Sequence, residues 1–80
     1  MDDAEIVQRI STLAAEEHRL EQSHAGSELS DEDVERLRSL EVALDQCWDL
    51  LRQRRARREV GQNPDDAAVR PENVVEGYRQ

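Results

Sequence analysis

The feature that most constrains this chain is a pair of apolar stripes with helical spacing, one on each side of a turn. Residues 2–24 carry the first stripe, at intervals of four and three: Ile6, Ile10, Leu13, Glu17, Leu20 and His24. Residues 31–60 carry the second stripe, again at intervals of three and four: Val34, Leu37, Leu40, Leu44, Cys47 and Leu51. This spacing places each set on one face of an α-helix. The sequence therefore predicts two amphipathic helices.

A turn over residues 25–30 should connect the two helices. Gly26 can adopt the left-handed backbone conformation that ends a helix, and Ser30 is a preferred residue for starting the next one. A connection this short makes two helices antiparallel neighbours, so residues whose numbers sum to about 55 should face each other. Leu13 is then expected to meet Leu40 and Leu44. We predict an all-α fold, an antiparallel two-helix hairpin that resembles a coiled coil.

The hairpin should occupy residues 1–60, and residues 61–80 should form an extended C-terminal tail. The tail contains two prolines and two glycines and has no helical period, so it is expected to be flexible by itself or docked on the hairpin. Its candidates for docking are Val74, Val75 and Tyr78.

The predicted core is small for an independent domain. Leu, Ile, Val and Phe together supply only 17 of the 80 residues, and chains of this size rarely gain more than a few kcal/mol from one core. Val7, Val42, Trp48 and Leu50 lie off the central stripes, and exposed apolar residues of this kind often pack against a second chain. We therefore expect a homodimer that forms a four-helix bundle. The alternative is a monomeric hairpin with Trp48 lying over its end.

Charge is strongly segregated along the chain. Nineteen acids and eleven arginines give a net charge of −8, yet residues 52–58 contain five arginines and no acid. Tryptophan and arginine dominate the energetics of protein interfaces, and Trp48 stands about one helical turn before this run. We predict a non-enzymatic interaction or regulatory module. The predicted partner-binding residues are Trp48, Arg52, Arg54, Arg55, Arg58 and Tyr78.

The stretch from Arg52 to Arg58 has a second interpretation, as a site for nucleic acid or for a nucleotide in transcription regulation. Arginines on a helix can neutralise phosphates. However, no aromatic residue is interleaved for base stacking, and the predicted hairpin brings the arginines close to Asp2, Asp3 and Glu5 at the start of the first helix. We favour the protein partner, with the arginines partly paired to these acids.

Catalytic and metal sites are not expected. Cys47 would lie about 15 Å from His18 in the predicted register, which favours a core role for the thiol. Glu17, Glu21 and His24 match the Glu-x-x-His pattern of di-iron bundles, but a histidine in the last turn more often complements the helix dipole. The favoured alternative pairs Glu17 with Arg38 across the seam between the helices. We predict no cofactor.

No segment has the apolar length of a membrane span, and the N-terminus lacks the features of a signal peptide. The expected location is therefore the cytoplasm.

Two segments carry a resemblance to a known family. Residues 40–59 (LEVALDQCWDLLRQRRARRE) and 70–80 (RPENVVEGYRQ) resemble a family of small acidic actinobacterial proteins that is known only as a domain of unknown function. The resemblance implies a cytoplasmic bacterial protein and implies no activity.

A weaker resemblance is to the helical-hairpin anti-sigma factors that bind cyclic di-GMP. Glu35, Ser39 and Gln46 match that motif, whereas Val42 and Leu50 stand where it has arginine and aspartate. The groups best suited to phosphate and guanine are therefore absent from these positions.

Overall fold

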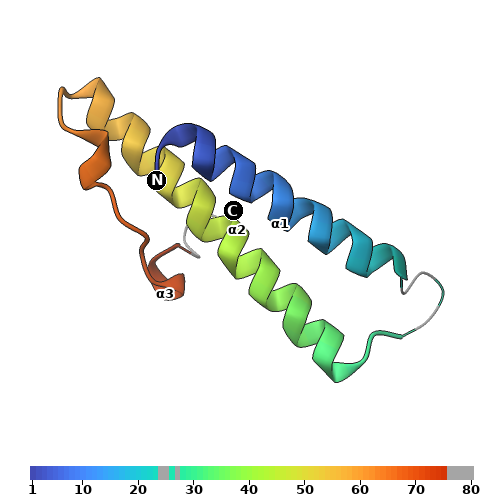
Figure 1. Cartoon of the computed structure of the whole chain (residues 1–80). Helices are drawn as coiled ribbons and strands as arrows, with labels where there is room; N and C mark the ends of the chain where they lie inside the picture. The colour runs from blue at the N-terminus through green and yellow to red at the C-terminus, as the bar shows by residue number, and fades with distance from the viewer. Residues whose placement is uncertain (24–25, 27, 76–80) are drawn as a thin grey trace.

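The chain folds into two long helices followed by a short return segment. A computed structural model describes residues 1–23, 26 and 28–75. Its elements are α1 (Asp3–Ser23), α2 (Asp31–Glu59), the 3-10 turn η1 (Pro64–Asp66) and α3 (Glu72–Val75), as Figure 1 shows. No strand occurs in the described residues, so the predicted all-α class is confirmed.

Side-chain caps explain where the long helices begin. At α1, the backbone N–H of Glu5 donates to Asp2 Oδ1 at 2.8 Å, and the backbone N–H of Asp2 donates to Glu5 Oε1 at 3.2 Å. At α2, the backbone N–H of Asp33 donates to Ser30 Oγ at 3.2 Å, which confirms the predicted cap. Each cap satisfies backbone donors that have no partner within the first helical turn. Gly26 lies between the helices with a φ of 85°.

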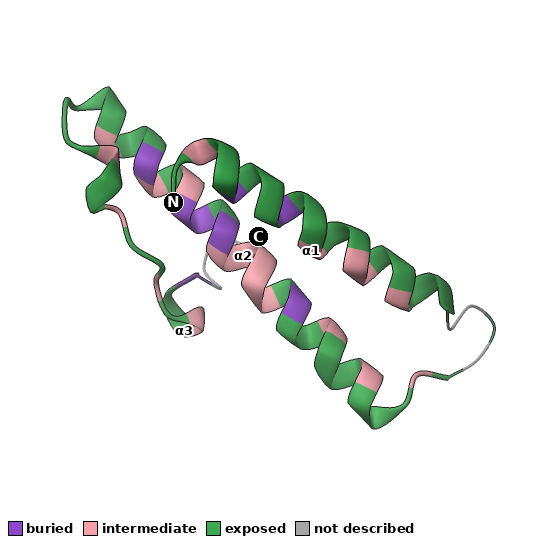
Figure 2. Cartoon of the chain, in the orientation of Figure 1, coloured by how far each residue is buried: buried purple, intermediate pink, exposed green. Residues whose placement is uncertain are grey.

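The helices lie side by side and run antiparallel (Figure 1). Leu13 of α1 and Leu44 of α2 pack against one core, as the predicted register requires. The buried members of this core are Ile6, Ile10, Cys47 and Leu50, and the partly buried members are Leu13, Leu44, Leu51 and Ala67. Figure 2 shows most buried positions in the half of the hairpin remote from the connecting turn. Cys47 is only 7 % exposed, which confirms its core role.

Residues 61–75 return along α2 and cover a second side of it. Gly61, with a φ of 76°, reverses the chain after α2. Ala67 then packs against the core, and Val75 is almost fully buried. This part of the tail is therefore docked. Tyr78 lies outside the described residues.

The predicted ion pair between Glu17 and Arg38 is wrong. The guanidinium of Arg38 donates to Glu72 Oε1 at 2.6 Å, across the contact between α2 and α3. The glutamate that bridges the hairpin is the neighbouring Glu16, which accepts a hydrogen bond from Arg36. The predicted register of the two helices was correct to within one turn. The partner of Arg38 is Glu72 of the tail, which the prediction for the hairpin did not include.

None of the helices described in the structure combines the length and the apolar character that crossing a bilayer requires.

Candidate functional site, a tryptophan surface beside an arginine cluster

Helical geometry divides the arginines of residues 52–58 into groups with different surroundings. Arg54 and Arg58 continue the row of α2 that faces α1, since they follow Leu44, Cys47 and Leu51 at intervals of three and four. Arg52 and Arg55 follow Trp48 at the same intervals and lie exposed on the adjacent flank of the helix. The one run of sequence therefore serves two different surfaces.

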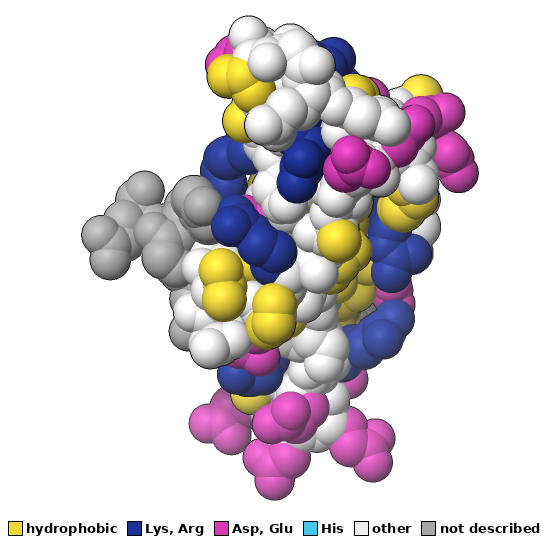
Figure 3. All heavy atoms as spheres, turned by 90° about the vertical axis from the view of Figure 1, so that its left-hand side faces the viewer, with side chains coloured by type: hydrophobic (Ala, Val, Ile, Leu, Met, Phe, Trp, Pro, Cys, Tyr) yellow, Lys and Arg dark blue, Asp and Glu magenta, His cyan; other side chains and the backbone are white. Residues whose placement is uncertain are grey.

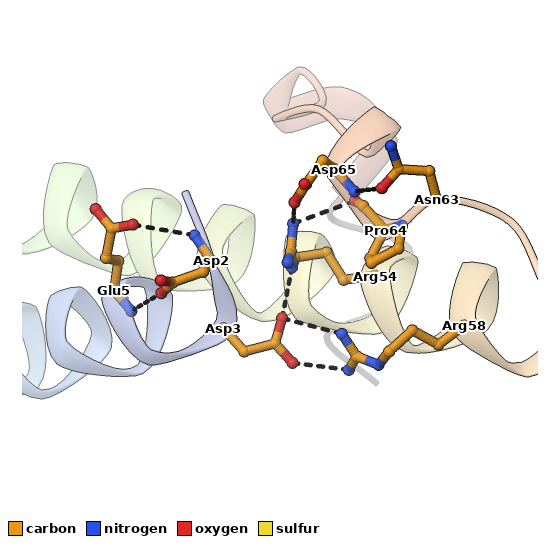
Figure 4. A network of polar contacts seen from close by, with 8 residues as sticks. All are labelled: Asp2, Asp3, Glu5, Arg54, Arg58, Asn63, Pro64 and Asp65. Atoms are coloured by element: carbon orange, nitrogen blue, oxygen red, sulfur yellow. Dashed lines mark hydrogen bonds and ion pairs between the residues drawn. The ribbon is translucent and has the colours of Figure 1, made fainter.

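Arg54 is the centre of a polar network that joins three elements (Figure 4). Its Nε donates to Asp3 Oδ1, and its Nη1 donates to Asp65 Oδ1 at 3.0 Å and to the carbonyl oxygen of Pro64 at 3.2 Å. Its side chain is only 7 % exposed. These contacts connect the first turn of α1, the last turns of α2 and η1. Arg54 is thus a structural residue, and we leave it out of the candidate surface.

Arg58 completes the same network from one turn further along α2. It donates from Nη1 to Asp3 Oδ1 at 3.2 Å and from Nη2 to Asp3 Oδ2 at 2.7 Å, a bidentate arrangement. Hydrogen bonds from Arg58, and then from Arg54, hold the pKa of Asp3 below its ordinary value. The prediction that basic residues at the end of α2 meet acids at the start of α1 is therefore confirmed for these residues.

A second polar cluster attaches the return segment to α2. Arg70 donates from Nε to Asp49 Oδ2 at 2.9 Å and from Nη2 to Asp49 Oδ1. Gln53 donates to Asp49 Oδ2 at 2.9 Å and also to the carbonyl oxygen of Ala68 at 2.8 Å. Asp49 is fully buried. The hydrogen bond from Arg70 lowers the pKa of Asp49 despite burial, which alone would raise it.

Sequence reasoning missed this cluster. The basic residue one turn away from Asp49 on α2 is Arg52, on the exposed flank, but the arginine that hydrogen-bonds to Asp49 is 21 positions distant in the chain. The available signal was an aspartate within an otherwise apolar stretch, Cys47 to Leu51, where an acid is costly to bury unless it is paired.

The exposed flank of α2 carries the candidate site. A hollow of about 470 Å³ opens there, lined by Asp3, Val7, Trp48, Leu51, Arg52, Arg55 and Arg58. Trp48 is 49 % exposed and Val7 of α1 is 51 % exposed. We call Val7, Trp48, Leu51, Arg52 and Arg55 the Trp48 surface. Figure 3 views the end of the molecule where α2 ends and shows exposed hydrophobic side chains lying among arginine side chains.

Acidic side chains gather on the other side of Trp48 along the hairpin. Burial, together with the nearby carboxylates of Glu21, Glu41 and Asp45, raises the pKa of Glu17. Glu21, Glu41 and Asp45 therefore lie close enough to disfavour the charge of Glu17. In the described residues, no three His, Cys, Asp or Glu side chains are grouped as they would be to hold a metal ion. His24, the third candidate ligand, lies outside those residues.

The later part of the face that would correspond to the cyclic di-GMP motif is occupied by the protein itself, whereas Glu35 and Ser39 are exposed. The amide of Gln46 donates to the carbonyl oxygen of Arg70 at 3.2 Å, and Leu50 is 6 % exposed in the core. Of the predicted partner-binding residues, the structure thus brings Trp48, Arg52 and Arg55 together in the open, whereas Arg58 stands at the rim bound to Asp3.

Comparisons with known proteins add a family and no activity. A family model described as "Protein of unknown function (DUF2630)" matches residues 2–80. Uncharacterized proteins of Mycobacterium bovis and Mycobacterium tuberculosis are 50% identical over 77 residues, which is 95% of this chain and 88% of each relative. No solved structure matches the chain.

Proposed function

Because the chain belongs to the DUF2630 family, which has relatives among uncharacterized mycobacterial proteins, we propose its function from the Trp48 surface: a non-enzymatic module of the cytoplasm that binds a protein partner. The observation that carries this proposal is the exposure of Trp48, the single tryptophan of the chain, beside a hollow of about 470 Å³. Exposed apolar side chains in a contiguous patch are typical of binding surfaces, and tryptophan is the side chain most enriched at binding hot spots.

The lining of the hollow indicates the chemistry of the partner. Val7, Trp48 and Leu51 offer aliphatic and aromatic contacts, while Arg52 and Arg55 stand exposed beside them. A partner that fits would insert an apolar side chain against the indole and place carboxylates near the guanidinium groups. Arginine is well suited to this role because its planar fork binds a carboxylate through two hydrogen bonds.

A catalytic role receives no support from the groups that line the hollow. Their side chains are aliphatic, aromatic or guanidinium, apart from the carboxylate of Asp3. That carboxylate is held by Arg54 and Arg58 and has a lowered pKa. A general base is most effective when its pKa lies near the working pH, so Asp3 is poorly suited to proton transfer at neutral pH.

Binding of a nucleotide or nucleic acid through Arg52–Arg58 is the second candidate. An indole beside guanidinium groups can stack on a base while the arginines contact phosphate. Against this, Arg54 and Arg58 are already paired with acids, and the carboxylate of Asp3 in the hollow would repel phosphate. The protein partner is therefore the better supported of the two.

Affinity capture with matched variants tests the proposal. Trp48→Ala should abolish recovery of a protein that the wild-type chain captures, whereas Val34→Ala should not, although Val34 is also 49 % exposed. Arg55→Glu should likewise prevent capture, and Arg19→Glu, an exposed arginine on α1, should serve as its control. Equal recovery by all four variants would refute the proposal. Circular dichroism would verify that each variant is folded.

Fluorescence of Trp48 separates the two candidates. At about 50 mM salt, phosphate contacts are strong enough to detect, so a nucleotide or nucleic-acid site should change the emission during titration with RNA, DNA or cyclic dinucleotides. We expect no change that depends on Arg55. A salt-sensitive change that Arg55→Glu removes would favour the second candidate over the first.

A further inference from the structure

Trp48 lies at the centre of a regular row of side chains on α2. The row follows the helix at intervals of three and four, one position after the row that faces α1: Arg38, Glu41, Asp45, Trp48, Arg52, Arg55 and Glu59. All of these residues are exposed except Asp45, which is half-buried. We call this set the Trp48 row. It is a single stripe along one helix, because residues three and four apart share a helical face.

Residues of the Trp48 row at similar distances before and after Trp48 carry opposite charges. Three and seven positions before it stand the acids Asp45 and Glu41, and four and seven positions after it stand Arg52 and Arg55. The outermost members continue the pattern, since Arg38 is ten positions before and Glu59 is eleven positions after. A stripe of this kind is complementary to an antiparallel copy of itself.

We propose that the partner of the Trp48 surface is a second copy of this chain, packed antiparallel against α2 with the two-fold axis at Trp48. This inference rests on the proposed function, because it names the occupant of the same surface. Trp48 would lie against Trp48 of the partner subunit. Arg55 would pair with Glu41 of the partner subunit, and Arg52 with Asp45 of the partner subunit. Two hairpins joined in this way form a four-helix bundle.

Glu41 and Arg55 are too far apart along the helix to pair within one chain, so they can pair only between subunits. Glu41 and Arg55 are 14 positions apart on one straight helix, which corresponds to about 21 Å at 1.5 Å per residue. Their side chains cannot meet within one chain. Between antiparallel copies centred on Trp48, the two residues fall at the same height on facing helices.

Existing contacts within the chain are compatible with this arrangement. Glu41, Asp45 and Arg52 take part in interactions within the chain, and Arg38 donates to Glu72. A carboxylate offers about four acceptor positions and a guanidinium five donors, so each can hold a second partner. Glu41 and Asp45 also lie near the carboxylate of Glu17, so arginines of a second subunit would bring opposite charge to a group of acids.

The apolar side chains that line the hollow lie where the two-fold axis places them. Val7 and Leu51 line the hollow with Trp48, and the return segment covers Gln46, Asp49 and Gln53 of α2 instead of this flank. An interface with aromatic residues at its centre and charged pairs at its edge has the anatomy of a specific protein contact.

Two complementary variants test the pairing. Arg52→Glu with Arg55→Glu makes the four charged positions nearest Trp48 all acidic. Glu41→Arg with Asp45→Arg makes the same four positions all basic. The wild-type chain should be dimeric by sedimentation equilibrium. Each double variant alone should dissociate about 100-fold more readily, since two-fold symmetry repeats every reversed pair. An equimolar mixture of the two variants should recover a dimer. Arg19→Glu and Glu35→Arg, exposed and outside the row, should leave the association unchanged.

A wild-type chain that is monomeric up to about 1 mM, the scale of the weakest specific association, would overturn the inference. So would a mixture of the two variants that fails to associate. Neither outcome would refute the proposed function, because capture of another protein through Trp48 would remain measurable. Conversely, a dimer that depends on the Trp48 row, without capture of any other protein, would support association of two copies of this chain and would give no support to a different protein partner.

Crosslinking supplies a second measurement that does not depend on charge reversal. Arg55→Cys and Glu41→Cys, each made together with Cys47→Ser, would place their single cysteines at facing positions of the two subunits and would leave Trp48 in place. Mild oxidation of an equimolar mixture of the two should give a covalent dimer that contains one copy of each. Glu35→Cys with Cys47→Ser carries its cysteine away from the row and should form no covalent dimer under the same conditions. Equal yields of covalent dimer from the mixture and from this control would contradict the proposed axis.

Discussion

Individual residues in this small protein stabilise contacts between segments that are distant in the sequence. Asp49 is fully buried and accepts hydrogen bonds from Arg70 and Gln53, while Asp3 accepts them from Arg54 and Arg58. Burial of a carboxylate is costly unless partners compensate for its lost hydration. The positions of Arg54, Arg58 and Arg70 are therefore tied to the acids that they neutralise.

Removing either member of the Asp49–Arg70 pair should have unequal effects. Arg70→Met leaves a fully buried carboxylate with no guanidinium partner and should cost about 3 kcal/mol. Asp49→Asn leaves a guanidinium whose side chain is 35% exposed and can be hydrated, so it should cost about 1 to 2 kcal/mol. Urea denaturation followed by circular dichroism would measure both values. A larger loss for Asp49→Asn would contradict this account of the pair.

Stability should pass through a maximum at mildly acidic pH. The raised pKa of Glu17 means that the folded state holds its proton more tightly, so this contribution is greatest below the unfolded pKa and declines as pH rises through the folded pKa. The lowered pKa values of Asp3 and Asp49 act oppositely: their contribution is present above about pH 4 and is lost below it.

Thermal denaturation from neutral pH to about pH 3, at one fixed low protein concentration, would show this maximum. Glu17→Gln should raise Tm at neutral pH and remove the increase on mild acidification. Glu35→Gln, at an exposed position elsewhere on α2, should preserve the increase. An unchanged profile for Glu17→Gln would mean that other groups cause it.

The element that organises the molecule is α2. One side of it packs on α1 through Cys47 and its neighbours, a second side binds the return segment through Asp49, and the flank between them carries Trp48. Its first turn is capped by Ser30, and the acids that follow complement the positive end of the helix dipole. Each side of the helix therefore has a distinct role.

The cap of α2 can be tested by a pair of like substitutions. Ser30→Ala removes the acceptor for the backbone N–H of Asp33 and should cost about 1 kcal/mol. Ser39→Ala replaces an exposed serine inside the same helix and should be neutral or stabilise slightly, because alanine has the higher helix propensity. Equal free energies of unfolding for the two variants would argue against the cap. Both can be compared by urea denaturation.

At the scale of the whole molecule, the return segment provides the second layer that a two-helix hairpin lacks. Ala67 packs on the core, Val75 is buried, and Arg54 binds Pro64 and Asp65. A hairpin alone buries only the narrow seam between its helices, which is a small core for a chain of this length. Residues 61–75 therefore contribute to the fold.

Truncation after Val60 should lower Tm, since it exposes Leu50 and leaves Asp49 without Arg70. The decisive comparison is Asp49→Asn in both lengths. In the full chain it should destabilise by about 1 to 2 kcal/mol. In the truncated chain it should be neutral or stabilising, because the carboxylate then lacks the paired hydrogen bonds from Arg70. The same loss in both lengths would contradict the proposed role of Arg70.

The sequence by itself determined the elements and their approximate pairing. Spacings of three and four predicted both helices, Gly26 and Ser30 indicated the turn and the cap, and the register placed Leu13 with Leu44. These features are local, since each depends on residues within one or two helical turns or on the length of one short connection. The exposed Trp48 and its neighbouring arginines were also readable from their spacing.

Only the tertiary structure decided which arginines are structural and where the return segment lies. Arg54 and Arg55 are adjacent in the sequence, yet Arg54 is buried against Asp3 and Asp65 while Arg55 is exposed. Asp49 likewise finds its partner 21 positions away. Pairings of this kind depend on how the chain reverses after Gly61. Desolvation and ion pairing act through space, so a charged residue acquires its role only when the fold brings its neighbours to it.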